Sequence, residues 1–361
     1  MRLEVYDPLR HEAAVLALRA NVWGATHPHT NAEFYRWLFR DTPDGKGSGI
    51  MAFNAADQLV GFAGISCRSG QYAGQAIKIC HGLEFMVDPA VPKMRSGKLA
   101  GQILTAHRNL AGELGYDCAV NYPNSNSFRM IVSRFGGYDL VFEPELIIRP
   151  LWNWSVPKEE TGNALKRVTL TFGGKAASVY SSLRAAACKS PVEIRAVPRF
   201  DADFDRFWQR LTLDGRLHST RDSRMLNWRY VDHPLYRYER LAAYRDGEVV
   251  GFIVVSPRQI MAVPALLVCD FAIPHDDPNV AEALVMAAVR LARAQKIGVI
   301  ASQIVQSDRR RAMLLRCGFI PVPRRQNPKQ FRLVARTFTP VGAPVNNAEN
   351  WSFGWGDMDV V

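Results

Sequence analysis

The stretch Leu83-Glu-Phe-Met-Val-Asp-Pro-Ala-Val-Pro-Lys-Met-Arg-Ser-Gly-Lys-Leu-Ala-Gly-Gln-Ile-Leu104 carries most of the information about the fold. It predicts a strand that ends at Val87 or Asp88, a basic loop that contains glycine, and a helix that begins between Ser96 and Leu99. Backbone N–H groups at such a helix N-terminus, reinforced by lysine and arginine, bind a pyrophosphate. A basic surface turn before an ordinary helix has the same pattern, so both interpretations stay open at this point.

The first half of the chain predicts helices that alternate with strands. Its order is helix, helix, hairpin, strand, helix, strand, helix, strand, at about residues 9–21, 31–40, 49–66, 77–87, 99–114, 118–121, 125–135 and 138–148. The second half repeats this order at about 199–213, 225–230, 241–255, 265–273, 280–294, 298–303, 308–316 and from 317 onward. The repeat is one of topology and not of close sequence, and it predicts two α/β domains of one plan.

Domain boundaries follow from this repeat and from changes in composition. We expect one domain at 1–150, a linker and bridging helix at 151–191, a second domain at 192–340 and a C-terminal tail at 341–361. The tail is rich in tryptophan, which disordered tails seldom are, so we expect it to dock on the protein.

Composition excludes several classes of protein. The 361 residues carry a formal charge of +11, which favours acidic partners, but no lysine/arginine block resembles a nucleic-acid-binding arm, so we expect no nucleic-acid partner. The six cysteines are scattered without metal-ligand or disulfide spacing, which predicts reduced thiols and no metal site. No apolar run of about 18 residues and no signal peptide are apparent, so we expect a cytoplasmic chain without a membrane span.

The basic stretch resembles the acyl-CoA loop of the GNAT superfamily, whose pattern is Arg/Gln-x-x-Gly-x-Gly/Ala after a strand that ends apolar-x-Val-x-Pro. Phe85-Met-Val-Asp-Pro89 fits the strand end, and Arg95, Lys98 and Ala100 fit the loop. Lys98 stands where the family usually has glycine. Residues 121–138 also resemble the family's segment in which two central strands splay apart and admit the pantetheine arm.

The resemblance implies two tandem GNAT domains, each with a mixed, mostly antiparallel central sheet flanked by helices, and acetyl-CoA or another acyl-CoA as cofactor. It implies that the cofactor contacts come from Phe85, Met86, Val87, Arg95, Ser96, Gly97, Lys98, Leu99, Ala100, Asn124 and Ser127. The corresponding place in the second half, after Ile273, is acidic and lacks glycine, and two carboxylates there repel a pyrophosphate. We therefore expect the second domain to bind no CoA.

The implied chemistry is attack of an amine on a thioester, and the amine must first lose a proton. Glu84 is the candidate base, although a solvent-facing strand glutamate has the same pattern; His81 is a weaker candidate. The family's tyrosine acid is replaced by Ser133, so Tyr138 or Tyr122 is left for that role. Two aspartates of the tail, Asp357 and Asp359, are candidates for binding a cationic amine. The alternative is that the tail only packs against the protein.

Three segments resemble a bacterial branch of tandem GNAT proteins often associated with surface-polysaccharide biosynthesis: residues 34–45, residues 221–234 and the tail with Asp357 and Asp359. The resemblance implies an N-acyltransferase, an N-acetyltransferase above all, that acts on a small-molecule amine such as an amino sugar. Two alternatives stay open, a non-catalytic GNAT-fold scaffold and an aminoacyl-tRNA-dependent peptidyltransferase, although the CoA-like loop argues against the second. The sequence leaves the oligomeric state open.

Overall fold

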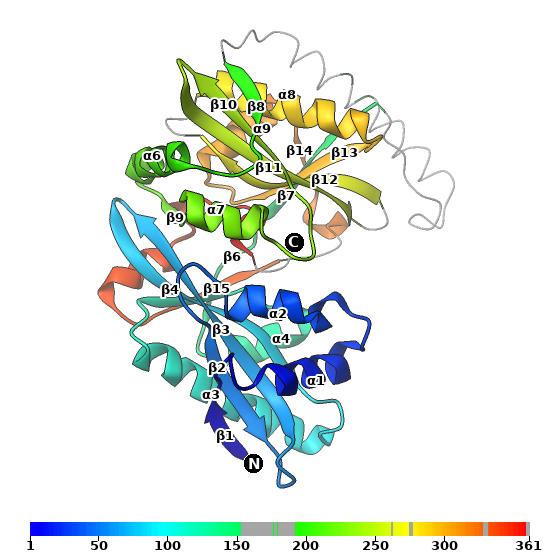
Figure 1. The fold of residues 1–361 in the computed structure, drawn as a ribbon, viewed down its shortest axis with the longest axis vertical. Coiled ribbons are helices and arrows are strands. Elements are labelled where there is room, and N and C mark those ends of the chain that lie inside the picture. The colour runs from blue at the N-terminus through cyan, green and yellow to red at the C-terminus, as the bar shows by residue number, and fades with distance from the viewer. Residues whose placement is uncertain are drawn as a thin grey trace.

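The computed structural model describes residues 1–152, 176, 179, 192–260, 263–273, 277–327 and 331–358. Within these residues the chain forms two mixed sheets that lie in the lower and upper parts of Figure 1. The predicted bridging helix falls almost entirely outside the described residues, and so does Asp359.

The first sheet has the order β1-β2-β3-β4-β5-β15-β6, and the short strand β9 pairs with the end of β3. Its strands are β1 Arg2–Val5, β2 Ser48–Phe53, β3 Leu59–Tyr72, β4 Gln75–Val87, β5 Cys118–Asn121, β6 Asp139–Phe142, β9 Leu217–Ser219 and β15 Leu333–Thr337. β4 and β5 run parallel, and the other described pairs of this sheet are antiparallel.

The second sheet has the order β14-β7-β13-β12-β11-β10-β8. Its strands are β7 Glu145–Pro150, β8 Glu193–Ala196, β10 Glu239–Arg245, β11 Glu248–Ile260, β12 Val263–Ala272, β13 Val299–Ile304 and β14 Ile320–Pro321. Here β12 and β13 are the parallel pair, and the other described pairs are antiparallel. The predicted mixed, mostly antiparallel sheets flanked by helices are therefore confirmed.

The two sheets exchange strands. β7 comes from the first half of the chain but lies in the second sheet between β14 and β13, and β15 comes from the second half but lies in the first sheet between β5 and β6. The single strand predicted at 138–148 is wrong, because the chain breaks after β6 at Glu143-Pro144 and crosses to the other sheet. Proline lacks the N–H that a continuous strand needs.

Helices cover both faces of the first sheet, as Figure 1 shows. α1 (Glu12–Trp23) and α2 (Ala32–Phe39) pack on one face, and α3 (Lys93–Glu113) and α4 (Ser125–Ile131) pack on the other. In the second half, α8 (Pro278–Ala294) and α9 (Arg309–Arg316) cover the outer face, while α6 (Ala202–Leu211) and α7 (Ser223–Tyr230) lie on the inner face.

A shared core joins the halves. Its side chains come from both sheets, from α6 and from the tail, and include Val120, Phe207, Val254, Leu267 and Trp351. At the contact between α2 and α7 the indole rings of Trp37 and Trp228 stack at 4.2 Å with an interplanar angle of 3°. Each indole N–H donates to the other tryptophan's carbonyl, at 2.8 and 3.2 Å. Because both tryptophans hold the sixth position of an eight-residue helix, equivalent surfaces of the two halves meet here.

Candidate functional site

A gap opens in the first sheet between its two parallel strands. β4 and β5 pair only over Ile79–Gly82 and Cys118–Asn121, after which the chain leaves β5 for α4 while β4 continues to Val87. β4 also carries one extra residue relative to β3, and Glu84 within this bulge has a φ of 53°. The stretch of β4 past Gly82 therefore has an edge that β5 does not cover, where backbone groups can bind a ligand.

The N-terminus of α3 lies directly after this strand end. The helix begins at Lys93 and not between Ser96 and Leu99, because Pro92 takes the N-cap position and the N–H groups of Arg95 and Ser96 already bond its carbonyl at 2.8 and 3.0 Å. No side chain caps this end, so the amides of Lys93 and Met94 remain for an anion. The predicted loop is thus the first two turns of a helix.

The basic side chains of α3 face solvent. Lys93, Arg95, Gly97 and Lys98 are exposed, and Lys98 in the family's glycine position meets no steric obstacle. The last two residues of the predicted loop, Leu99 and Ala100, are buried against the sheet. Their side chains belong to the core and are not available to a ligand.

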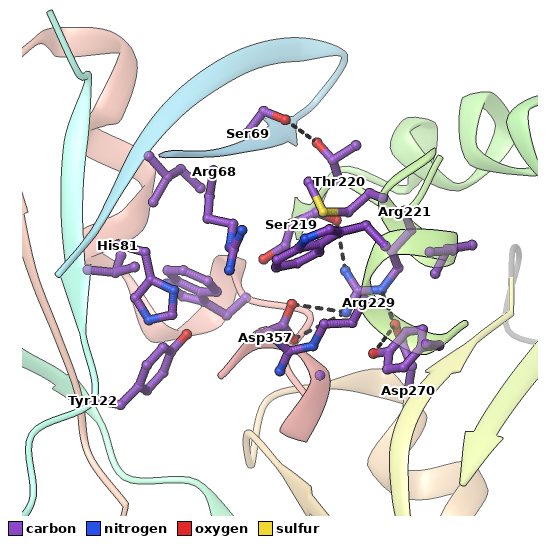
Figure 2. A pocket seen from close by; sticks show the side chains of 18 residues that line it. Arg68, Ser69, His81, Tyr122, Ser219, Thr220, Arg221, Arg229, Asp270 and Asp357 are labelled. Atoms are coloured by element: carbon purple, nitrogen blue, oxygen red, sulfur yellow. Dashed lines mark hydrogen bonds and ion pairs between the residues drawn. The ribbon is translucent and has the colours of Figure 1, made fainter. Parts of the chain in front are cut away.

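A cavity of about 50 Å³ lies between the halves, next to the gap. Arg68 of β3, His81 of β4 and Tyr122 after β5 enter it from the first sheet, while Arg229 of α7 and Asp357 of the tail enter it from the other side (Figure 2). His81 is 2% exposed, and its ring meets the Tyr122 ring edge-on at 5.2 Å. Arg68 stacks on the Trp228 ring at 4.3 Å.

No protein-family model matches the chain, and no curated protein matches its sequence. Solved structures do match its architecture. A GCN5-related N-acetyltransferase from Anabaena variabilis aligns with a TM-score of 0.61 and 9% identity over 95% of this chain and 74% of that chain. A GCN5-related N-acetyltransferase from Kribbella flavida aligns with a TM-score of 0.59 and 15% identity over 93% of this chain and 71% of that chain. Saccharomyces cerevisiae N-myristoyltransferase with bound myristoyl-CoA aligns with a TM-score of 0.52 and 12% identity over 93% of this chain and 79% of that chain.

The chain has the GNAT fold. At these identities the similarity establishes the fold and leaves the reaction to the site itself. Among the described residues, no group of three or more histidine, cysteine, aspartate or glutamate side chains is arranged to hold a metal ion. None of the described helices has the length and apolar character needed to cross a membrane.

The GNAT fold places the candidate base Glu84 in a buried ion pair. Arg19 of α1, which is 0% exposed, donates from Nε and Nη2 to both carboxylate oxygens at 3.0 and 2.7 Å. Glu84 itself is 3% exposed, and the ring of His29 lies 3.6 Å from one of its oxygens. The carboxylate therefore ties α1 to the bulge of β4, with both oxygens engaged.

Tyr138, the candidate acid, is buried on the α3 side of the sheet. Burial raises the pKa of its phenol well above the ordinary value, so the group keeps its proton. It nevertheless lies beside the gap, since a Cβ added at Gly82 would be 3.5 Å from its hydroxyl. The candidate cofactor residues after β5 act locally: Asn124 caps α4 by accepting the N–H groups of Asn126 and Ser127 at 3.0 Å.

Asp357 lines the cavity but is already paired. Arg221 donates from Nε to Asp270 at 3.0 and 3.1 Å and from Nη2 to Asp357 at 3.1 and 3.2 Å. Burial lowers the pKa of the Arg221 guanidinium, but the two carboxylates outweigh it and raise that pKa. A cationic amine would therefore compete with Arg221 for Asp357.

The second half closes the equivalent gap with the tail. β12 and β13 pair over Ala265–Leu267 and Val299–Ala301, and beyond them Arg310 donates to the carbonyls of Phe271 at 2.5 Å and Phe353 at 3.0 Å. Trp351, Phe353 and Trp355 are buried there, and Gly354 and Gly356 pass close to the carbonyl of Cys269. The acidic residue at α8 caps its own helix: Asp277 accepts the amides of Asn279 and Val280.

Sequence reasoning missed two residues of the cavity, Arg68 and Arg229. Arg68 stands in the long strand β3, and only the packing of the halves brings it onto Trp228. Arg229 belongs to the Trp-Arg-Tyr segment, which carried the resemblance to a bacterial branch but no chemistry. A buried arginine next to two aromatic residues was the available signal.

Proposed function

We propose that the protein is an acyl-CoA-dependent N-acyltransferase with one active site, built on the gap between β4 and β5. One observation carries the proposal. The gap begins at Gly82 and Asn121, and the residues adjacent to them, His81 and Tyr122, line the cavity between the halves. An acyl donor held along the gap therefore meets an acceptor held in the cavity, as direct transfer requires.

The residues around the gap fit acyl-CoA. The uncapped amides at the start of α3 and the side chains of Lys93, Arg95 and Lys98 suit a pyrophosphate, and the free edge of β4 from Phe85 to Val87 suits a pantetheine amide. Acyl-CoA supplies the acyl group as a thioester, so an amine nitrogen forms the new C–N bond while the C–S bond breaks and the thiolate leaves. Acetyl-CoA is the donor we expect.

His81 is the proposed base, in place of Glu84. An alkylammonium has a pKa of roughly 10, so the acceptor needs a group that removes its proton. Glu84 has both oxygens bound by Arg19, whereas the His81 ring lies in the cavity beside the first unpaired residues of β4. An imidazole is the side chain most often used as a general base near neutral pH.

A protonated group is also needed near the departing thiolate. Tyr138 keeps its proton and lies beside Gly82 on the α3 side of the gap, and Tyr122 lies on the cavity side. We assign the proton donation to Tyr138 and the positioning of the His81 ring to Tyr122, whose edge-on contact fixes the imidazole plane.

Calorimetric titration with acetyl-CoA, followed by an assay of thiol release with a panel of amines that includes amino sugars, tests the proposal. Micromolar binding and amine-dependent thiol release are expected. Binding without release for any amine would favour a scaffold that retains the nucleotide. Absence of binding to acetyl-CoA and free CoA would overturn the proposal and direct attention to aminoacyl-tRNA as donor.

A further inference from the structure

The strand β1 forms an edge of the first sheet, since β2 is the only described strand that pairs with it (Figure 1). Its apolar side chains are exposed, Leu3 at 38% and Val5 at 57%, and so is Met1 directly before it, at 60%. Of the ten exposed large apolar side chains among the described residues, four lie within residues 1–9. An exposed apolar edge strand is a site where another strand adds to a sheet.

The other edges of the two sheets are protected from such pairing. β6 has a shift in register against β15, and the chain reaches Pro144 two residues after this strand ends. β14 has only two residues, and on β8 the apolar side chain of Ile194 packs against the core of the second half. Bulges, prolines and very short strands keep an edge from pairing with another chain. β1 has a continuous register with β2 and contains no proline.

The backbone of β1 points its free hydrogen-bonding groups outward at the odd positions. The N–H of Tyr6 donates at 2.9 Å to the carbonyl of Gly49, which lies opposite it in the continued register of β1 and β2. In an antiparallel pair, the N–H and C=O groups of successive residues point alternately to the two sides of the strand. The even positions of β1 therefore face β2, as Tyr6 does, whereas the N–H and C=O groups of Leu3 and Val5 face outward.

Charged and apolar side chains lie on opposite faces of β1. Residues directly opposite each other in a sheet share a face. Leu3 lies opposite Ala52, a core residue on the α3 side, and Arg2 lies opposite Phe53, on the side of α1 and α2. The apolar residues of the strand therefore lie on the α3 side, and Arg2 and Glu4 lie on the other side.

We propose that β1 pairs in antiparallel fashion with β1 of a second copy of this chain, with the two-fold axis at Leu3. Leu3 then lies opposite Leu3 of the other copy, and their outward N–H and C=O groups form a hydrogen-bonded pair. Met1 lies opposite Val5, so that apolar side chains cover one another on the α3 side. Arg2 lies opposite Glu4 on the other side, and opposite charges in such a cross-strand pair stabilise a sheet.

The neighbouring registers are excluded by charge and by backbone geometry. An axis at Arg2 or at Glu4 would place two like charges directly opposite each other, which destabilises a sheet. An axis between two residues would place an outward-facing residue opposite one whose backbone groups face β2, and hydrogen bonds would be lost. The sequence of residues 1–5, Met-Arg-Leu-Glu-Val, is therefore self-complementary about Leu3.

A short strand pair of this kind makes a weak dimer. A stable interface buries about 800 Å² on each partner, more than five residues of an edge strand provide. The net charge of +11 on each copy also opposes association. We therefore expect a reversible dimer whose fraction rises with protein concentration. β2 and β3 lie between β1 and β4, so pairing leaves both proposed active sites open.

Sedimentation velocity over a series of protein concentrations, with two charge variants, tests the proposal. Arg2→Glu and Glu4→Arg each place like charges opposite each other, so each should raise the dimer dissociation constant at least about fivefold. An equimolar mixture of the two variants pairs opposite charges at both positions and should dimerise as the wild type does. The double variant Arg2→Glu/Glu4→Arg should do the same. Arg2 also contacts Asp57 of its own chain, but exposed ion pairs of this kind contribute little.

A third variant tests the backbone contact. Leu3→Pro removes the outward N–H and leaves the bonds of β1 to β2 in place, so it should abolish the dimer with little change in Tm. Leu213→Lys removes a side chain that is 74% exposed in the second half, and this control should dimerise as the wild type does. If Leu3→Pro lowers Tm strongly, the charge variants and their mixture decide the question. Acyl transfer per chain should be the same in all these variants.

A wild-type protein that stays monomeric at every concentration would overturn the proposal. So would a dimer that persists unchanged in Leu3→Pro and in both charge variants, because it would use another surface. If each charge variant loses the dimer and their mixture does not recover it, the antiparallel register at Leu3 is wrong. None of these outcomes depends on acyl transfer, so the dimer and the proposed function stand or fall separately.

Discussion

The two halves share one backbone plan and differ in what fills the space between their parallel strands. Each has a parallel pair that separates after three or four residues, and each has one extra residue in the first strand of that pair. In the first half, the part of β4 beyond its pairing with β5 has no neighbouring strand on that side. In the second half, the tail occupies the corresponding space. The GNAT fold thus provides a gap in each half, and a short segment of chain decides whether that gap stays open to a ligand.

The helices that follow the two gaps also differ in whether their N-terminal amides are free to bind an anion. The N-cap of α3 is Pro92, which offers no side-chain cap and is followed by exposed lysine and arginine. The N-cap of α8 is Asp277, which accepts two amides and pairs with Arg245 at 2.8 Å. An aspartate at an N-cap satisfies the donors that a phosphate would need. Both strands present apolar residues to the shared core, Ile77 and Ile79 from β4 and Ala265 and Leu267 from β12, but β4 also presents His81 to the cavity.

The largest expected effect tests whether catalysis belongs to the first half alone. His81→Gln should lower kcat by roughly 100-fold or more, the usual contribution of a general base, with the Kd for acetyl-CoA unchanged. The pH profile of kcat/KM should lose the limb that the imidazole provides. His218→Gln, in the second half, should lower stability and keep kcat. Wild-type kcat in His81→Gln would return the role of base to Glu84 or to solvent.

The next effect compares the two helix N-termini. The double variant Lys93→Ala/Arg95→Ala should raise the Kd for acetyl-CoA by roughly 10- to 100-fold, because charge-assisted contacts to phosphate are lost. Arg245→Ala, at the start of α8, should leave this Kd unchanged. Calorimetry at two salt concentrations checks both, since contacts to phosphate weaken with salt. Equal losses in both variants would contradict a site confined to the first half.

A pair of glycine substitutions compares the filled gap with the open one. Gly356→Ala should destabilise the protein by about 1–3 kcal/mol, because its Cβ would lie 2.9 Å from the carbonyl oxygen of Cys269 and against the hydroxyl of Tyr230. Gly97→Ala, with nothing within 4 Å of the added Cβ, should stabilise α3 by about 0.5–1 kcal/mol. Urea unfolding measures both. A neutral Gly356→Ala would mean that the tail is loosely held.

The last prediction concerns two buried histidines. Burial lowers the pKa of His107, on α3, to about 4, whereas Asp214 partly opposes the effect of burial on the pKa of His218. In the unfolded chain an imidazole titrates near ~6.5, so below that pH the unfolded state binds a proton that the folded state does not. Stability is therefore full above pH ~6.5 and falls toward pH 4, by at most about 1.4 kcal/mol per pH unit.

His107→Gln should make this acid-side slope of the unfolding free energy shallower, and His218→Gln should change it less. Denaturant titrations between pH 7 and 4 measure the slope. The carboxylates contribute equally in wild type and His107→Gln, whereas His218→Gln also changes the surroundings of Asp214. Identical slopes in wild type and His107→Gln would show that His107 is protonated in the folded protein.

The order of elements could be predicted from the sequence, and the pairing of strands could not. Alternation and turn residues place β4 and β12 well, but β7 and β15 are short apolar strands whose pattern fits either sheet. Gly97 in the sequence predicts a loop at this point, whereas the proline N-cap at Pro92 sets the start of α3 at Lys93. The candidate side chains on β4 could be predicted from the sequence. Arg68 and Arg229 could not, because they come together only when the two halves pack.

The exchange of β7 and β15 has a consequence for synthesis on the ribosome. The first sheet cannot place a strand between β5 and β6 until Leu333–Thr337 has emerged from the ribosome, after the strands of the second sheet have been made. Contacts of such long sequence separation form late, so the N-terminal half waits with an incomplete sheet while the rest is made. A chain that stops before Leu333 therefore lacks a strand of the sheet that carries the proposed site.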